Sequence, residues 1–341
     1  MATCASPTPN SRSSRARSAE QLAASSGRAS VGAALLALLP VVFFADCRRA
    51  PATEEQPARA ETSSKLWNYP EERWDDPALA RQPRLQFVWH TPDERRPSIF
   101  SMKLDGTDIR RVAGPELLYS GEAKSLSQVP VRSPDRRYVA CVGDDANGDQ
   151  LRFLVDLKTR TVRTMMKTSG AVHFNWTPDS KHALFYGDIK LWQYDVDSGK
   201  TTELPMIYSR GLYLVDEGRR FVAIRENRIE QYDRSGKLVR KLPLPFEPGT
   251  DHSISGDARL IAFDLRPESL VVPIDHPDKP VFHGQQPLRF PAFGPDGRTL
   301  YFFDSNDLLA LDVSSGGVTH LTRFPGALPG WTTALAAVGR P

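Results

Sequence analysis

The sequence is poor in cysteine, in net charge and in long apolar segments. Only Cys4, Cys47 and Cys141 occur among 341 residues, so the chain has no disulfide framework and must be stabilised by a packed core. The formal net charge is +3, and without residues 1–46 it falls to about +1. Acidic and basic residues alternate along the rest, which excludes the concentrated basic face that nucleic-acid binding requires.

The longest apolar run covers residues 31–45, which is shorter than the ~20 residues that a membrane-spanning helix needs. What is abundant is turn-forming residues, with 28 prolines and 23 glycines beside an ordinary globular share of 40% hydrophobic residues. This composition favours β-structure joined by many turns. The length allows either two average domains or one large all-β domain.

Residues 1–46 have the organisation of an export signal. Residues 1–30 are rich in Ser, Ala and Arg and nearly free of acidic residues, and they precede the apolar run. This order predicts a signal peptide. Cys47 follows directly and resembles the lipidated cysteine of a bacterial lipoprotein box, although Asp46 stands where that pattern has Gly or Ala. The resemblance implies a lipid on Cys47, with plain secretion or an uncleaved anchor as alternatives, and residues 47–83 form a tether and lead-in.

A repeat of turn-like sites runs through the remainder of the chain. Five sites begin 44, 39, 39 and 39 residues apart, and they read SPDR from Ser133, TPDS from Thr177, DEGR from Asp216, SGDA from Ser255 and GPDG from Gly294. This spacing is typical of propeller blades. In such a turn Pro presets φ for the first corner, Asp bonds back to the backbone, and Gly or a short polar residue tolerates the second corner. A short apolar strand follows each site, at residues 138–142, 183–186, 221–224, 260–263 and 300–303.

Three repeats continue with a second strand and a Ser-Gly turn. Residues 191–195, 229–233 and 308–312 contain alternating apolar and polar side chains and end in Asp, as expected for strands with one buried face. A final short strand follows, as at 201–204 and 318–322. Each repeat is therefore a four-stranded antiparallel meander that gains a core only by stacking on its neighbours. Radial closure predicts an all-β, six-bladed β-propeller over residues 84–341, with seven blades as the alternative.

The first and fifth blades depart from this pattern. The first blade keeps strands at 85–89 and 98–102 but lacks the preceding turn. Its inner strand is predicted to come from the C-terminal region, where residues 329–333 resemble the segment 174–177 that precedes a turn elsewhere. In the fifth blade Pro267, Pro273 and Pro277 predict an irregular outer edge.

The order of Pro-Asp-Gly turn, apolar strand, strand ending in Asp, Ser-Gly-Lys turn and final Leu-Thr strand resembles the TolB-type, WD40-like repeat of bacterial periplasmic propellers. It also resembles the propeller of prolyl-oligopeptidase-like enzymes. The likeness covers roughly residues 84–331 and implies a stand-alone propeller in the periplasm or cell envelope. A stand-alone propeller is expected to lack the α/β domain of TolB and the hydrolase domain of the oligopeptidases, and a Gly-x-Ser-x-Gly elbow is absent from the sequence.

Known catalytic and metal-binding motifs are also absent. The sequence contains no His-Glu-x-x-His, no phosphate-binding Gly loop and no Cys pair at ligand spacing. The seven histidines are scattered, and His90, His173 and His252 are expected near strand ends. Isolated histidines of this kind are predicted to be structural or surface residues.

Two local features allow a functional interpretation beside a structural one. Asp145, Asn147 and Asp149 alternate as calcium ligands do, but no bidentate Glu follows at the required distance. Because Asn147 precedes Gly148 between two apolar strands, a hairpin turn is the favoured interpretation. Cys141 lies within an apolar strand and is predicted to be a small buried thiol rather than a nucleophile.

These observations favour a non-enzymatic, monomeric binding propeller in the bacterial cell envelope, without a cofactor and with a protein or envelope ligand as its partner. The Asp residues recur at turn positions in nearly every blade, whereas a catalytic site needs different residues from different blades. The alternative is a metal-dependent hydrolase or lactonase with its site in the central channel. A third hypothesis is a carbohydrate or cell-wall ligand bound by aromatic residues at the channel mouth, namely Trp89, Trp176 and Trp192.

Overall fold

The computed structural model describes residues 69–91, 94–127, 130–170, 173–188, 190–207, 211–249, 251–325 and 336–338. The chain divides into two compact units, Met1–Ala60 and Glu61–Pro341, and all described residues belong to the second. Among them, no helix is long and apolar enough to cross a membrane. The predicted export segment and Cys47 lie outside the described residues.

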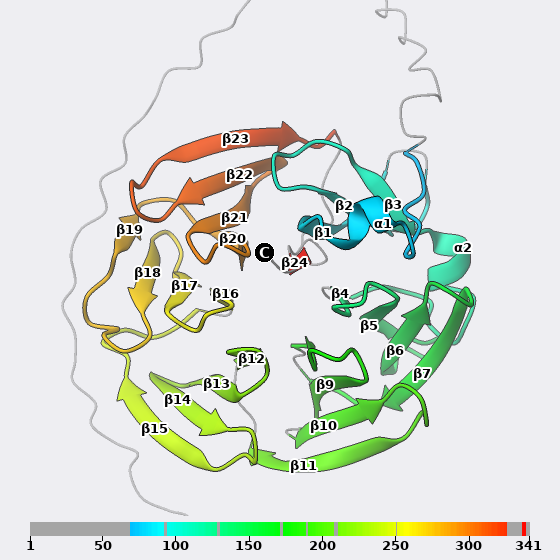
Figure 1. Cartoon of the computed structure of the whole chain (residues 1–341), viewed down its shortest axis with the longest axis horizontal. Helices are drawn as coiled ribbons and strands as arrows, with labels where there is room; N and C mark the ends of the chain where they lie inside the picture. The colour runs from blue at the N-terminus through cyan, green and yellow to red at the C-terminus, as the bar shows by residue number, and fades with distance from the viewer. Residues whose placement is uncertain are drawn as a thin grey trace, which may run out of the picture. The chain divides into compact units, whose positions relative to one another are not determined.

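The second unit contains six four-stranded antiparallel sheets arranged in a ring around a central axis (Figure 1). This arrangement confirms the predicted six-bladed β-propeller, and the seven-bladed alternative is wrong. The only helices among the described residues are α1 (Pro77–Ala80) and α2 (Pro115–Leu118), each a single turn.

Counted from the inner strand outward, the first three blades are β24 (Ala336–Val338), β1 (Arg84–Trp89), β2 (Ser98–Lys103) and β3 (Arg110–Ala113); β4 (Val131–Arg132), β5 (Tyr138–Asp144), β6 (Gln150–Asp156) and β7 (Thr161–Lys167); and β8 (Asn175–Trp176), β9 (His182–Gly187), β10 (Lys190–Asp195) and β11 (Thr201–Ile207). The last three are β12 (Gly211–Val215), β13 (Arg220–Arg225), β14 (Arg228–Asp233) and β15 (Leu238–Pro243); β16 (His252–Ile254), β17 (Leu260–Asp264), β18 (Ser269–Pro273) and β19 (Phe282–Gly284); and β20 (Arg289–Phe293), β21 (Thr299–Asp304), β22 (Asp307–Asp312) and β23 (Val318–Arg323).

The ring closes through a strand from the C-terminal region. β24 pairs antiparallel with β1, so that Leu85 lies opposite Ala337 and Gln86 lies opposite Ala336. The prediction that the first blade takes its inner strand from this region is thereby confirmed. The segment proposed for it, residues 329–333, lies outside the described residues, and the strand that pairs with β1 begins at Ala336.

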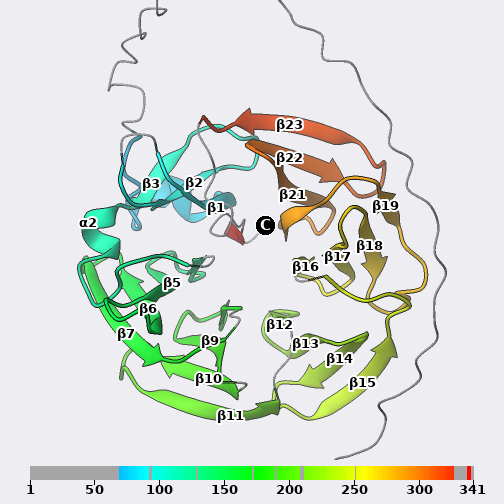
Figure 2. The ribbon, with the colours of Figure 1, turned by 180° about the vertical axis from the view of Figure 1, so that it is seen from behind.

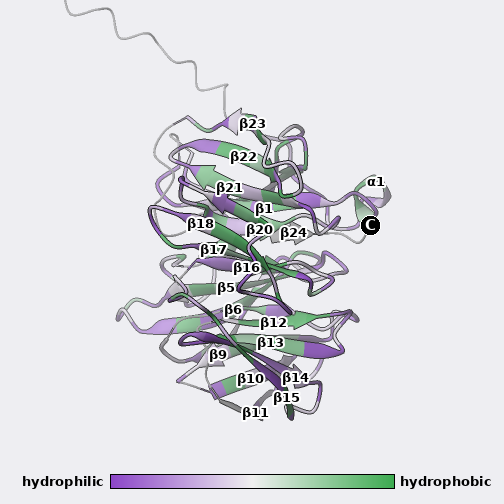
Figure 3. Ribbon diagram, turned by 90° about the vertical axis from the view of Figure 1, so that its left-hand side faces the viewer, coloured by the Kyte–Doolittle hydropathy of each residue, from purple (hydrophilic) through white to green (hydrophobic). Residues whose placement is uncertain are grey.

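Burial decreases from the second strand of each blade to the outermost strand. In β5 six of seven residues are buried, whereas β15 and β23 contain no fully buried residue. The second strands are apolar on both faces because each blade packs between two neighbours. Figure 3 shows the ring from the side, coloured by hydropathy, with the strands running between its two faces.

The recurring turns between first and second strands use the chemistry expected from their sequence. A Ser or Thr hydroxyl donates to the Asp two residues later, at 2.5 Å from Ser133 to Asp135, 2.6 Å from Thr177 to Asp179 and 2.7 Å from Ser255 to Asp257. The fourth residue is left-handed, with φ of 69° at Arg136, 61° at Ser180, 57° at Ala258 and 64° at Gly297. The Asp residues therefore hold turns, as their repetition predicted.

The up-and-down course of the strands separates two kinds of link onto opposite faces of the disc. We call the turn face the one that holds the turns between first and second strands and between third and fourth strands. The opposite connection face holds the turns between second and third strands and the links from one blade to the next. The described parts of those links are irregular and include residues 114–127, 168–170 and 244–249, the first of which contains α2.

The seam between the sixth and first blades is the most aromatic part of the core. Phe324, which follows β23, packs against Phe87 and Trp89 with ring centroids 5.0 and 5.3 Å apart. Trp89 is fully buried there, and Trp176 is buried at 8% exposure with its indole N–H donating to the Val131 carbonyl at 3.0 Å. The hypothesis that these tryptophans present a carbohydrate-binding surface is therefore wrong for both, because they fill seams between blades.

The remaining local predictions agree with the structure. Blade five is irregular at its edge, since β19 has three residues and Pro273 ends β18. Cys141 is fully buried between the first and second blades, and this burial raises the pKa of its thiol. A buried thiol with a raised pKa is a poor nucleophile, in agreement with its predicted structural role.

Candidate binding face

Polar side chains on the inner strands connect neighbouring blades around the axis. The Asn175 amide donates to the Leu212 carbonyl at 2.7 Å and accepts from the Leu214 N–H at 2.9 Å. One blade pair later, the Ser253 hydroxyl accepts from the Phe293 N–H at 3.4 Å. Asn175 and Ser253 occupy equivalent positions, two residues before the first turn residue, so this bonding is part of the repeat.

Towards the connection face, three rings from consecutive blades gather beside the axis. His173 precedes β8, Tyr213 lies in β12 and His252 begins β16, and their ring centroids are 5.4 to 5.7 Å apart. The Tyr213 hydroxyl donates to the His252 carbonyl at 2.7 Å. We call these three residues the axial cluster. Gly211 is required beside it, because a Cβ there would lie 2.1 Å from the His252 Nε2.

An acidic group adjoins the axial cluster. Burial raises the pKa of Asp251. The charge of Arg266 lowers this pKa and the nearby Asp264 carboxylate raises it, and the net change is a rise. Arg266 pairs with both carboxylates, at 2.8 Å to Asp251 and 2.9 Å to Asp264. Burial also raises the pKa of the Tyr213 hydroxyl, and the Asp251 charge acts in the same direction. This end of the axis therefore contains packed rings and hydrogen-bonding groups that do not recur in every blade.

The residues considered as calcium ligands form a turn instead. The Asp145 carboxylate accepts the backbone N–H groups of Asn147 and Asp149 at 2.8 and 3.0 Å, and it pairs with Lys167 at 2.9 Å. Gly148 has a φ of 84°, which agrees with the hairpin interpretation. In the part of the chain that the structure describes, no group of three His, Cys, Asp or Glu residues is placed to hold a metal ion.

The three singled-out histidines lie at strand ends, as predicted, since His90 follows β1 directly. They are isolated in the sequence, but the structure brings two of them, His173 and His252, together. The repeat signals only the contact of Tyr213 with His252, because each stands three residues before the first residue of a repeated turn, whereas His173 stands four residues before Thr177. Equivalent positions in successive blades surround the same axis.

A second feature that the sequence analysis missed is formed by residues 69–82, which we call the strap. It lies on the turn face, because the Leu79 carbonyl accepts a hydrogen bond from Arg136 in the turn between β4 and β5. Its helix α1 lies in front of the blades in Figure 1 and behind them in Figure 2. Tyr69 packs against Trp89 and Phe100, with ring centroids 5.7 Å away in both pairs. The Tyr69 ring thus anchors the beginning of the strap to the first blade.

The strap delivers one carboxylate to three buried arginines. The side chain of Glu72 is fully buried and forms ion pairs with Arg132, Arg136 and, at 3.6 Å, Arg84. Burial by itself would raise the pKa of Glu72, but the charges of Arg132 and Arg136 with the hydrogen bond from Ser101 lower it to about 2. We call the three arginines the arginine slot.

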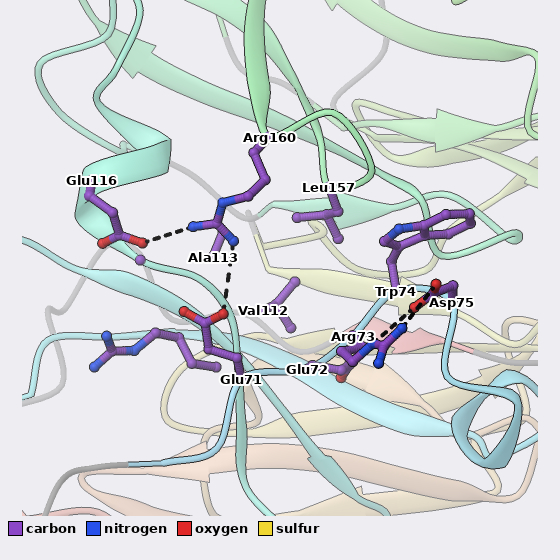
Figure 4. A pocket seen from close by; sticks show the side chains of 12 residues that line it. Glu71, Glu72, Arg73, Trp74, Asp75, Val112, Ala113, Glu116, Leu157 and Arg160 are labelled. Carbon is purple, nitrogen blue, oxygen red and sulfur yellow. Dashed lines mark hydrogen bonds and ion pairs between the residues drawn. The ribbon is translucent and has the colours of Figure 1, made fainter.

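Beside the strap lies an open cavity of about 230 Å³. Figure 4 shows that Glu71 and Glu116 approach it from two sides with Arg160 between them. Arg160 lies 3.9 Å from Glu71 and 3.5 Å from Glu116, and all three side chains are more than half exposed. Because these three charged side chains are solvated and pair with one another, they give no support for a ligand site in the cavity.

The chain is similar to known proteins in its fold but not in its sequence. No protein-family model matches the chain, and no curated protein matches it. The solved structure of TolB from Acinetobacter baumannii is similar with a TM-score of 0.55 and 17% identity, over 75% of this chain and 67% of that one. A functionally unknown protein from Desulfotomaculum acetoxidans is similar with a TM-score of 0.50 and 13% identity, over 72% of this chain and 83% of that one. The described ring thus has a TolB-like propeller fold.

Proposed function

We propose that this protein is a binding propeller of the bacterial cell envelope that holds a protein partner on its connection face. The observation that supports this most directly is the difference between the two faces. On the turn face, the carboxylates of Asp135, Asp179 and Asp257 accept hydrogen bonds from hydroxyl groups within the repeated turns. The connection face combines irregular links with the axial cluster, whose residues come from three blades.

The envelope location and the attachment are part of the same proposal. A TolB-like fold supports an exported protein, although fold alone is an indirect argument for function. Residues 1–46 act as the export signal and Cys47 receives a lipid, so that residues 48–68 connect the lipid to the ring. In this arrangement the propeller works without catalysis, by presenting a rigid surface.

Site-specific photo-crosslinking in cells tests which face binds. Asn147 and Glu226 are exposed at connection-face turns, and Ser235 and Ser315 are exposed at matched turn-face turns. A photo-reactive amino acid at either connection-face position should yield one stoichiometric protein adduct, and the turn-face positions should yield none. Adducts from the turn face alone would overturn the choice of face, and adducts from neither face would overturn the protein-binding proposal.

Attachment is tested separately by intact mass and membrane fractionation of the wild type and Cys47→Ala. A mass addition of the size of a diacylglyceryl group, lost in the variant together with membrane association, is expected. An unmodified wild-type protein in the soluble fraction would contradict the lipid anchor but leave the binding face unaffected. The two parts of the proposal can therefore fail independently.

A further inference from the structure

The strap contacts the ring in the way that an extended peptide contacts a receptor. Its backbone pairs in parallel with the outer strand of the first blade, where the Arg111 N–H donates to Pro70 at 2.9 Å and the Glu72 N–H donates to Arg111 at 2.7 Å. Tyr69 packs against the rings of Trp89 and Phe100, and Leu79 is buried at 3% exposure. Main-chain pairing with separate side-chain anchors is the usual mode of binding by β-augmentation.

The arginine slot belongs entirely to the ring. Arg84 begins β1, Arg132 ends β4, and Arg136 lies in the turn that follows. Among the described residues, Glu72 is the one acidic partner of Arg132 and Arg136, while Arg84 also pairs with Asp108 at 2.9 Å. The ring thus supplies all three arginines without the strap. The arginines require a carboxylate partner, because a buried cation without a partner is strongly destabilising.

The slot contains more donors than Glu72 uses. The Nη2 of Arg132 and the Nε of Arg136 are buried and have no hydrogen-bond partner, although the two side chains are 2% and 4% exposed. Arg136 also adopts a left-handed φ of 69°, at the position where the sixth blade has Gly297. The same position is left-handed at Ser180 and Ala258 in other blades, so this turn accepts residues other than Gly, and Arg136 uses it to place a guanidinium that can bind an anion.

One side of the strap is open to solvent. Glu71, Arg73 and Asp75 are exposed, and the cavity of about 230 Å³ separates this side of the strap from the ring. Its helix has four residues, too few to be stable without tertiary contacts. Only residues 81–83 join the strap to β1.

From this geometry we infer that the arginine slot and the adjoining edge of β3 form a binding site for an acidic peptide, and that the strap of a second copy can replace the chain's own. The occupant is identified by complementarity, since residues 69–82 already contact the aromatic rings of the first blade, the edge of β3 and the arginine slot. Exchange of an identical element between copies creates no new type of contact and is a low-cost route to dimers. The protein is then monomeric when dilute and exchanges straps when concentrated.

Peptide binding to the full chain tests the receptor. The probe is a fluorescein-labelled synthetic peptide of residues 69–82, compared with the same peptide carrying Glu72→Gln. The receptor is the full chain with Glu72→Ala, which frees the slot, and the isosteric Glu72→Gln chain replaces it if the alanine variant does not fold. The native peptide should bind about 10-fold or more tightly than its Gln version, because charged hydrogen bonds are lost. Equal binding of the two peptides, or no binding, would overturn the carboxylate site.

A second measurement distinguishes specific carboxylate binding in the arginine slot from nonspecific binding of the peptide. Millimolar acetate should raise the melting temperature of Glu72→Ala by several degrees and leave that of the wild type unchanged, since only the variant has a vacant slot. The matched control is Glu116→Ala, an exposed glutamate whose melting temperature should not respond. A response of all three proteins would overturn specific binding in the slot.

Sedimentation equilibrium tests the second copy as the occupant. The wild type should show a concentration-dependent dimer that added strap peptide disperses, and Glu72→Ala should remain monomeric over the same range. A wild type that stays monomeric up to millimolar concentration would overturn strap exchange, and a dimer that persists equally in Glu72→Ala would place the dimer contact elsewhere.

Discussion

Single residues of this propeller differ between blades where the repeat has acquired an additional task. The left-handed turn position is Gly297 in the sixth blade but Arg136 in the second, where the guanidinium contacts the strap. Asn175 links its inner strand to β12 through its side-chain amide, whereas the fourth blade has the apolar Leu214 at the equivalent position. Comparison of equivalent positions in the six blades identifies such residues, because it separates the role that the blades share from the role that belongs to one blade.

At this scale we predict that Glu72 makes the stability of the ring sensitive to acid. Its pKa is about 2 in the folded chain and 4.5 without the fold, so the carboxylate stabilises the ring fully above pH 4.5 and progressively less as the pH falls towards 2. Glu72→Gln should lower the free energy of unfolding by about 3 kcal/mol at pH 7. Urea unfolding of both proteins at pH 7, 4 and 3 measures the difference.

The difference between wild type and variant should shrink below pH 4.5. If it stayed constant with pH, the loss would come from packing rather than from charge. Glu116→Gln is the control, because this side chain is 58% exposed and its replacement should change the free energy of unfolding by less than about 0.5 kcal/mol.

Elements of the fold are specified mainly by their turns. A four-residue turn with a hydroxyl, an Asp and a left-handed fourth residue precedes the second strand in several blades. The strand that follows is apolar on both faces and enters the seams, while the outer strand remains exposed. The turn therefore sets where each strand begins, and the burial on both faces then fixes its orientation.

We predict that the backbone conformation, rather than space, favours glycine in the sixth turn. Gly297 has a φ of 64°, and an added Cβ would meet only the Asp257 carboxylate, at an ordinary 3.5 Å. Gly297→Ala should therefore lower the free energy of unfolding by about 1 kcal/mol. Gly256→Ala in the fifth turn is the matched control, because it has open space and no left-handed φ. Chemical denaturation that showed equal losses in both variants would contradict this explanation.

The whole molecule depends on ring closure, in which β24 pairs with β1. The adjoining seam buries the aromatic rings of Phe87, Trp89 and Phe324. Closure by a strand from the other end of the sequence makes the first blade complete only when residues about 250 apart have met. The strap adds a second, separate connection across the first and second blades.

A chain that ends at Pro325 should lose closure. Removal of β24 leaves the edge of β1 unpaired, and loss of its hydrogen bonds should lower the free energy of unfolding by about 2–3 kcal/mol. Hydrogen exchange should then show β1 losing protection before the other second strands. A chain that ends at Val338 keeps β24 and is the control. Unchanged protection of β1 in the shorter chain would contradict the closing role of β24.

The sequence by itself determined the repeat, the number of blades, the positions of most strands and the structural duty of the turn Asp residues. These features are local, because a turn and its flanking apolar strand recur within about 40 residues. Burial of Cys141 and the turn at Asp145 were predictable for the same reason.

Only the tertiary structure decided which distant residues meet. The axial cluster joins His173 with His252, and the arginine slot joins Glu72 from the predicted lead-in with Arg132 from the second blade. It also showed that Trp89 belongs to the closing seam and not to a ligand surface. Periodicity shows that a residue is apolar or repeated, but the curvature of the ring and the path of the strap determine its neighbours, and these depend on packing between blades that no local pattern contains.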